Sequence, residues 1–326
     1  MISRRRFTGL AAASLLAPAF IARHALAQAW PTRPVRIIIG FGGGLDAAAR
    51  IIADPLTALW GQPAIVEAKT GAGGNIAAET VARSAPDGHT VLLAGTPLAV
   101  NRYLYQSLSY DAVADFAPVS LVSLQPNVMI VPSSSPAHSV AEFIARAKAN
   151  PGKITFGSPG HGTSVHLCGE LFKRATGIEI THVPYRSASV TMSDLIAGRI
   201  DTVFSTLAVA LPQIGAGQAR GLAVAWPKRA AAAPELPTFA EAGVPGLDEV
   251  ALWFGLFVPA KTPAEIIRRI HADTVSALAD PTVRTRFERI GATPIGSTPA
   301  ELATHFKAEM DRWGPVIKEA KITINE

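Results

Sequence analysis

Residues 157–164 form a glycine-rich loop whose composition suits the binding of an anion. The loop follows a short β-prone run, Ile154–Phe156, and precedes apolar residues at helical spacing, so the pattern predicts strand, turn and helix in that order. Thr163 or Ser164 can cap the helix. A helix start presents unpaired N–H groups and about half a positive charge, and glycines let a ligand approach them closely. The loop therefore indicates a carboxylate or phosphate site, with an ordinary ligand-free connection as the alternative.

A second loop of the same kind lies near the start of the chain. Val35–Ile39 is predicted to be a strand, and the glycine-rich residues 40–45 follow it. Asp46 is expected to cap the next helix, and Pro55 is expected to kink or split that helix. Two glycine loops that each open a helix suggest two half-sites facing one ligand.

Further candidate positions follow other predicted strands, in the loops 95–97, 184–187 and 204–206. Ligands of parallel sheets bind beyond the carboxyl ends of the strands, so these loops are expected to converge on one cleft. Tyr185 and Arg186 are the candidate polar contacts from the second half of the cleft; a solvated surface charge is the alternative for Arg186. The predicted ligand-binding residues are Gly43, Gly44, Leu45, Asp46, Thr96, Ser158, Gly160, His161, Gly162, Thr163, Ser164, His166, Tyr185, Arg186, Ser205 and Thr206.

Catalytic and metal motifs are weak in this chain. A hydrolase nucleophile elbow needs G-x-S-x-G, and the residue two before Ser158 is Phe156. His161, His166 and His182 invite a metal interpretation, but no H-E-x-x-H or Cys/His spacing supports it. The sequence therefore predicts no catalytic residue, no metal and no cofactor.

Two further patterns exclude other classes of site. The turn at 70–75 lacks the last glycine of G-x-G-x-x-G, because position 76 is Ile, so a dinucleotide site is weakly supported. The single cysteine, Cys168, lies on the apolar face of the helix after the central loop and allows no intrachain disulfide. A buried structural role is predicted for it.

The first 27 residues have the pattern of a twin-arginine export signal. Arg4, Arg5 and Arg6 precede an apolar run over 9–22 that is too short to span a bilayer, and Ala25-Leu-Ala27 is a cleavage site. The alternative is a cytosolic chain with a chance basic start. The segment carries four arginines and no acid, so its removal leaves 26 basic against 25 acidic residues. The mature chain is expected to be periplasmic and near neutral, which argues against a nucleic-acid partner.

The rest of the 326-residue chain predicts two α/β domains. The composition, 48% hydrophobic and 17% charged, is that of a packed globular protein. Strand and helix patterns alternate, which favours doubly wound, mainly parallel sheets covered by helices. Helix starts are predicted at Ser139-x-x-Glu142, Thr262-x-x-Glu265, Asp280-Pro281 and Thr298-x-x-Glu301.

Eight short motifs, in this order, resemble the Bug-type periplasmic receptors of tripartite tricarboxylate transporters. The resemblance runs from about residue 30 to residue 322. The motifs are Gly71-Ala-Gly-Gly-Asn75, Pro86-Asp-Gly88, Asp115-Phe-Ala-Pro-Val119, Pro151-Gly-Lys153, Gly160-x-Gly-Thr163-x-x-His166, Val183-Pro-Tyr185, Pro237-Thr-x-x-Glu-Ala-Gly243 and Arg312-Trp-Gly314.

The resemblance implies a two-lobed periplasmic-binding-protein fold, similar to type II, with the ligand cleft between the lobes. It implies a small organic acid as ligand, held by backbone N–H groups, hydroxyls and waters, and delivered by a monomer to the membrane subunits of the transporter. The expected lobes are 28–126 plus 254–326, and 127–253. Three positions depart from the family pattern: only Leu45 separates Gly44 from Asp46, Ser187 replaces a glycine, and Ala68 replaces an asparagine. An exported hydrolase and a sensory receptor that feeds a regulatory partner are the alternatives.

Overall fold

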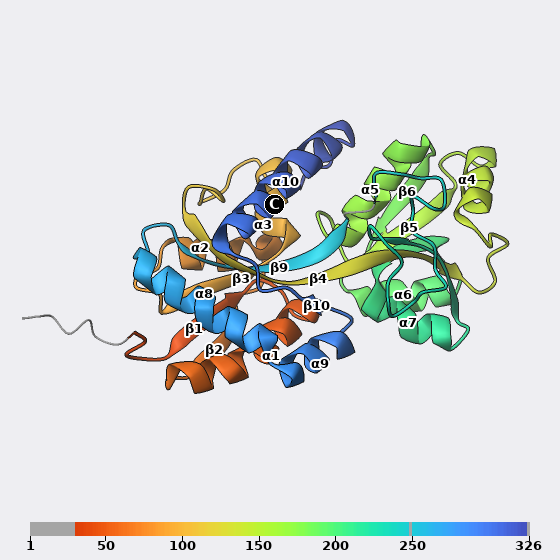
Figure 1. Ribbon diagram of the computed structural model, residues 1–326. Helices are drawn as coiled ribbons and strands as arrows, with labels where there is room; N and C mark the ends of the chain where they lie inside the picture. Colours follow the sequence, from red (N-terminus) through yellow and green to blue (C-terminus); the bar gives the residue numbers. More distant parts are fainter. Residues whose placement is uncertain (1–29, 248–249, 325–326) are drawn as a thin grey trace, which may run out of the picture.

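The computed structural model describes residues 30–247 and 250–324, in which strands and helices alternate (Figure 1). The predicted export segment, 1–27, lies outside the described residues. The elements are β1 (Val35–Ile39), α1 (Gly44–Trp60), β2 (Ala64–Ala68), η1 (Ala72–Gly74), α2 (Asn75–Ala82), β3 (Thr90–Ala94), α3 (Thr96–Leu104), β4 (Phe116–Pro132), α4 (Val140–Ala149), β5 (Ile154–Ser158), α5 (Ser164–Thr176), β6 (Ile180–Pro184), α6 (Ala188–Ile196), β7 (Thr202–Thr206), α7 (Leu207–Gly215), β8 (Ala219–Ala225), β9 (Ala251–Pro259), α8 (Ala264–Ala279), α9 (Pro281–Arg289), β10 (Thr293–Pro294) and α10 (Pro299–Glu319).

These elements form two lobes joined through β4 and β9 (Figure 1). Lobe 1 contains β1–β3, β9 and β10 with α1–α3 and α8–α10, and lobe 2 contains β5–β8 with α4–α7. The strand order is β2-β1-β3-β9-β4-β7-β5-β6, with β8 and β10 also paired to β4. Strands β1, β2 and β3 are parallel, as are β5, β6 and β7, whereas β4 and β9 run antiparallel to their neighbours. The predicted two-lobed α/β fold is confirmed.

Strand β4 passes from one lobe to the other and changes its partners on the way. Its residues 116–126 pair with β9, and its residues 127–132 pair with β7 and β8. Pro126 is the last residue of the first part, opposite Ala251, and Asn127 is the first of the second part, opposite Thr206. A proline has no backbone N–H to donate, so it suits the point where one ladder ends and the next begins.

The helix starts were predicted correctly where a side chain accepts a hydrogen bond from the backbone N–H two or three residues further along the chain. Thr163 accepts from the His166 N–H, Ser139 accepts from the Glu142 N–H, and Asp280 caps α9. Thr298 and Glu301 form a full capping box. Such caps depend on local sequence alone.

Two expectations about helix caps were wrong, and one about helix continuity was wrong in part. The residue before α1 is Gly43, and Asp46 lies in the first turn, paired with Arg50 at 2.9 Å, so Asp46 is no cap. Pro55 does not split α1, which runs unbroken from Gly44 to Trp60, whereas the expected kink stays a prediction. Thr262 does not cap α8 either, since Pro263 holds the cap position and makes no side-chain bond.

The Arg312-Trp-Gly314 motif has a structural role in lobe 1. The buried carboxylate of Glu309, 2% exposed, accepts hydrogen bonds from the indole N–H groups of Trp253 and Trp313 and pairs with Arg312 at 2.7 Å. Any Cβ on Gly314 would lie 3.0 Å from the ring of Tyr103. The motif therefore fixes α10 against β9 and α3.

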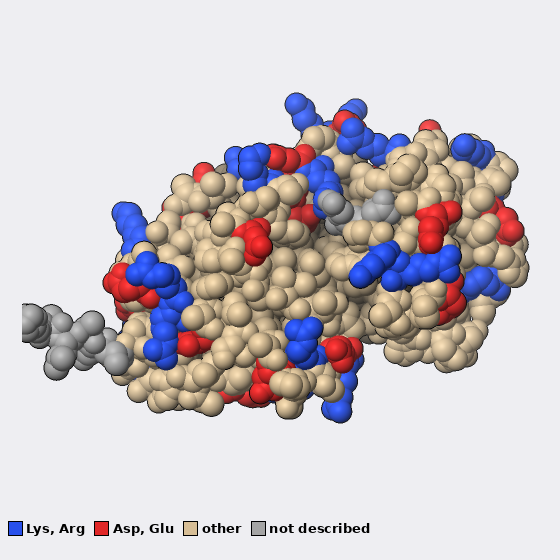
Figure 2. Space-filling model, viewed as in Figure 1, with Lys and Arg blue, Asp and Glu red and all other residues tan. Residues whose placement is uncertain are grey.

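Acidic and basic side chains alternate over both lobes on the face drawn in Figure 2, without a large area of one sign. Among the described residues, no helix has the length and apolar character needed to cross a membrane.

Candidate functional site

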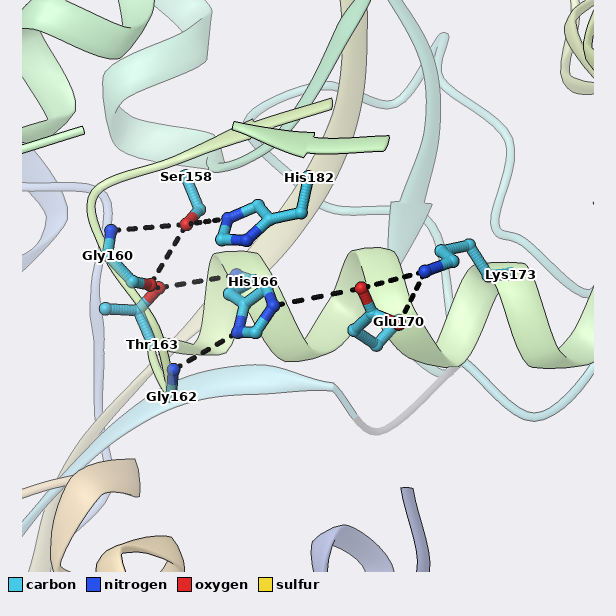
Figure 3. A network of polar contacts seen from close by, with 8 residues as sticks. All are labelled: Ser158, Gly160, Gly162, Thr163, His166, Glu170, Lys173 and His182. Carbon is cyan, nitrogen blue, oxygen red and sulfur yellow. Dashed lines mark hydrogen bonds and ion pairs between the residues drawn. The ribbon is translucent and has the colours of Figure 1, made fainter. Parts of the chain in front are cut away.

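The loop between β5 and α5 is held in shape by its own hydroxyl groups (Figure 3). The Thr163 hydroxyl accepts from the His166 N–H at 3.3 Å and donates to the Gly160 carbonyl at 2.9 Å. Ser158 Oγ accepts from the Gly160 N–H at 3.2 Å and donates to the same carbonyl at 3.0 Å. Both hydroxyls are therefore used inside the loop, so the backbone N–H groups at the start of α5 are the donors left for an anion.

The loop between β1 and α1 is more open. Gly43 has φ 70° and ψ −131°, a conformation that favours glycine, and Gly44 begins the helix. No described side chain caps this helix start. Leu45 is buried, whereas Gly43 and Gly44 are exposed. The N–H groups of the first turn are thus accessible to a ligand.

Both helix starts lie against side chains of β4. A Cβ built on Gly44 would lie 4.0 Å from Gln125 Nε2, and Asn127 Nδ2 donates to the Ser164 carbonyl at 3.4 Å. Residues two apart on a strand share a face and are about 7 Å apart. The starts of α1 and α5 therefore face the same short piece of β4, although they belong to different lobes.

Several polar atoms along this part of the molecule are buried without a hydrogen-bond partner among the described residues. They are Thr96 Oγ1, Ser123 Oγ, Gln125 Nε2 and Asn127 Oδ1. Such atoms are few in folded proteins and call for an explanation, such as water or a ligand. Sequence reasoning named Thr96 but missed the other three. Their alternation, Ser123, Gln125, Asn127 in an otherwise apolar run, was the available signal.

The remaining predicted residues, Tyr185, Arg186, Ser205 and Thr206, lie in lobe 2. Tyr185 donates to Asp194 at 2.9 Å, and burial, followed by this carboxylate, raises the pKa of its hydroxyl. Arg186 is exposed, with no hydrogen bond or ion pair among the described residues. Ser205 is buried in β7 next to Thr206, which precedes α7 but makes no side-chain cap bond. Thr206 lies opposite Asn127, which puts the start of α7 beside that of α5.

Three imidazoles gather behind the β5–α5 loop. His166 and His182 stack with ring centroids 3.9 Å apart, and His161 stands edge-on to both at 5.3 and 5.1 Å. His161 is exposed, His182 is half-buried and His166 is buried. Burial first, and the neighbouring imidazoles second, lower the pKa of His166 to about 2 and that of His182 to about 3. Both rings are therefore uncharged at neutral pH.

Ser158 and His182 form a close pair, with Ser158 Oγ 2.7 Å from His182 Nε2. Such a pair could activate a nucleophile. However, Ser158 is 0% exposed and its hydroxyl is tied to Gly160, so it offers no approach to a substrate. The geometry supports a binding loop better than a hydrolase site.

A hollow in lobe 1 adjoins the start of α1. It is lined by Phe41, Leu45, Gly74, Gly95 and Tyr110, among others, and its walls are mainly apolar. Phe254 also lies 3.8 Å from the Cβ position of Gly44. The surroundings of this helix start can therefore pack against hydrocarbon.

Comparison with protein families gives one match over most of the chain. The family model described as "Tripartite tricarboxylate transporter family receptor" matches residues 48–322. Among curated proteins, the "UPF0065 protein in tcbD-tcbE intergenic region" of Pseudomonas sp. (strain P51) is 37% identical, covering 100% of this chain and 97% of its own. Protein BugT of Bordetella pertussis is 34% identical over 93% of this chain and 94% of its own.

Two solved structures with bound acids are also similar. An R. palustris protein solved with adipate has 37% identity and a TM-score of 0.82, covering 90% of this chain and 100% of its own. MatC from Rhodopseudomonas palustris, with bound malate, has 30% identity and a TM-score of 0.78, covering 88% of this chain and 100% of its own.

Proposed function

The chain belongs to the receptor family of the tripartite tricarboxylate transporters, and we propose that it is a non-catalytic receptor for a small organic acid. The acid binds between the lobes and is delivered to the membrane subunits of such a transporter. The adipate and malate bound by similar proteins support a carboxylate as the ligand.

The observation that carries this proposal is the meeting of two helix starts at one piece of β4. The first turn of α1 lies beside Gln125, and Asn127 contacts the first residue of α5. Each helix start offers free N–H donors and a positive dipole end. Neither loop contains a Lys or Arg, so hydrogen bonds rather than an ion pair hold the carboxylate. Bonds to a charged group contribute about 1.5–3 kcal/mol each. Two or three suffice for micromolar binding, about −8.2 kcal/mol, when lobe closure and apolar contact meet the costs of association.

Contacts between the lobes support closure around the acid. A Cβ on Gly162 would lie 2.5 Å from Leu104 Cδ1, so this glycine lets the β5–α5 loop approach α3 of lobe 1 closely. Arg174 of α5 pairs with Glu319 of α10 at 3.2 Å. In our proposal these contacts form when the lobes, 28–126 plus 254–326 and 127–253, close on the ligand.

Export through the twin-arginine route is part of the same proposal. A receptor of this kind works outside the cytoplasm, and the first 27 residues carry the signal pattern. N-terminal sequencing of protein recovered from the periplasm is expected to begin near Gln28. A start at Met1 in that fraction would contradict it.

The test is a thermal-shift screen of mono- and dicarboxylates, including adipate and malate, on the mature protein. A binder at 100 times its Kd is expected to add about 2.7 kcal/mol of stability. Gly44→Val should then lower the affinity for that acid, because the valine methyl groups fill the approach to α1. The fold itself should tolerate the new Cβ, since its nearest heavy atom is 3.8 Å away.

Gly215→Ala is the matched control, since a Cβ there meets nothing within 4 Å. Equal affinity for the Gly44→Val variant and the control would mean that the acid lies elsewhere. Failure of every acid in the screen would refute the receptor proposal itself.

A further inference from the structure

The three histidines behind the β5–α5 loop come from separate parts of the sequence and present their ring nitrogens to one another. His161 belongs to the loop, His166 to the first turn of α5 and His182 to β6. One nitrogen from each ring lies within 4.8 Å of the other two. The parallel pairing of Phe156 in β5 with His182 in β6 brings the third ring to the other two. The spacing of the three histidines in the sequence does not predict this cluster, because the place of His182 depends on the pairing of β5 with β6.

The two less exposed rings are held by contacts of the kind that orient metal ligands (Figure 3). Since the Ser158 hydroxyl donates to Gly160, His182 Nε2 is the donor to Ser158 Oγ, which leaves Nδ1 with a free lone pair. His166 Nδ1 accepts from the Gly162 N–H at 3.2 Å, so its proton is on Nε2, 3.8 Å from the Glu170 carboxylate. This distance is too long for a hydrogen bond, but a small turn of the ring would give the carboxylate the place that supporting carboxylates take behind histidine ligands in metal sites.

The third ring is the one that can move. His161 is exposed and follows Gly160, whose φ is 129°. Within the described residues its ring has only the two edge-on imidazole contacts and no hydrogen bond. The stacked rings of His166 and His182 do not converge on one point as they lie. Nitrogens that share a zinc ion at about 2.0–2.1 Å are at most about 4.2 Å apart, so binding requires the rings to turn and draw together.

We propose that His161, His166 and His182 bind a divalent transition metal ion such as Zn²⁺. Neutral imidazole nitrogens favour zinc, copper and nickel over magnesium or calcium. On binding, the metal displaces the Gly162 N–H from His166 Nδ1, which frees that N–H for another acceptor. Three protein ligands leave one coordination position open on the side of the exposed His161, beside the start of α5. A carboxylate in the cleft is a suitable fourth ligand for that position.

The experiment uses the mature, tag-free chain, stripped with a chelator and titrated with Zn²⁺ by calorimetry. The wild type is expected to bind one equivalent and to gain thermal stability with added zinc. His161→Ala should lower the affinity at least about tenfold, because loss of a ligand costs no less than loss of a supporting contact. His138→Ala, an exposed histidine outside the cluster, is the control and should bind as the wild type does.

A second readout identifies the ligands directly. The Cu²⁺-loaded protein is expected to show nitrogen hyperfine structure in its electron paramagnetic resonance spectrum, and His161→Ala should reduce the number of coupled nitrogens. The proposal is overturned if the wild type binds no zinc, or if His161→Ala binds zinc as tightly as His138→Ala does. The receptor proposal needs no metal, so it is tested separately by measuring the binding of the organic acid in the presence of chelator.

Discussion

Replacing Thr163 by valine is expected to destabilise the folded protein and to weaken acid binding. The substitution keeps the shape of the side chain but removes a hydroxyl that caps α5 and also bonds the Gly160 carbonyl at 2.9 Å. Loss of a helix cap costs about 1 kcal/mol, and loss of a neutral hydrogen bond costs about 1 kcal/mol more. The free energy of unfolding should therefore fall by about 2 kcal/mol. For a chain of this length, that lowers Tm by about 3 °C.

The assay is urea unfolding of the mature protein, with Thr163→Ser as the matched variant. Serine keeps the hydroxyl and should retain most of the stability, so the difference between the two variants isolates the hydroxyl. Calorimetry with an acid found in the screen provides the second measurement, and the valine variant should bind more weakly because its loop is no longer held in shape. If the valine and serine variants unfold within 0.5 kcal/mol of each other, the loop does not depend on this hydroxyl and the reasoning fails.

Three further substitutions test other parts of the structure. Glu309→Gln should lower the free energy of unfolding by about 2 kcal/mol, because it removes a buried carboxylate that accepts from two indole N–H groups and pairs with Arg312. Lys307→Gln, in an exposed pair, should change it by less than about 1 kcal/mol, and equal losses in urea unfolding would contradict this. Burial, and secondarily a nearby arginine, lower the pKa of His305 to about 4. The unfolded chain therefore takes up a proton at this residue before the folded chain does, so the free energy of unfolding falls as the pH is lowered from about 6.5 towards 4. His305→Phe should flatten the pH dependence of urea unfolding over that range, and an unchanged slope would exclude His305 as its source. Gly162→Ala should weaken acid binding through its clash with α3, whereas Gly177→Ala, also at positive φ but in open space, should not; calorimetry that finds equal affinities would remove the contact from the closure model.

The sequence predicted the fold correctly, whereas the ligand-binding residues that it named stay predictions. Alternating strand and helix patterns are local, and so is the cap at Thr163, which was expected and is confirmed. Asp46 was wrongly expected to be a cap because the glycines before it let the helix begin earlier than the acid. Gln125 and Asn127 were missed because their position between two helix starts depends on how β4 crosses between the lobes. The place of His182 likewise depends on the pairing of β5 with β6.

Strand β4 also governs how the protein unfolds. Because this one strand belongs to the sheets of both lobes, unfolding either lobe removes hydrogen-bond partners from the other. The largest group of buried apolar side chains also runs through both lobes, since it includes Ile38 of β1 and Phe204 of β7. The two lobes should therefore melt in a single cooperative transition, and neither lobe should fold when it is expressed alone. A bound acid would then protect the amide hydrogens of the whole chain from exchange, including those far from the cleft.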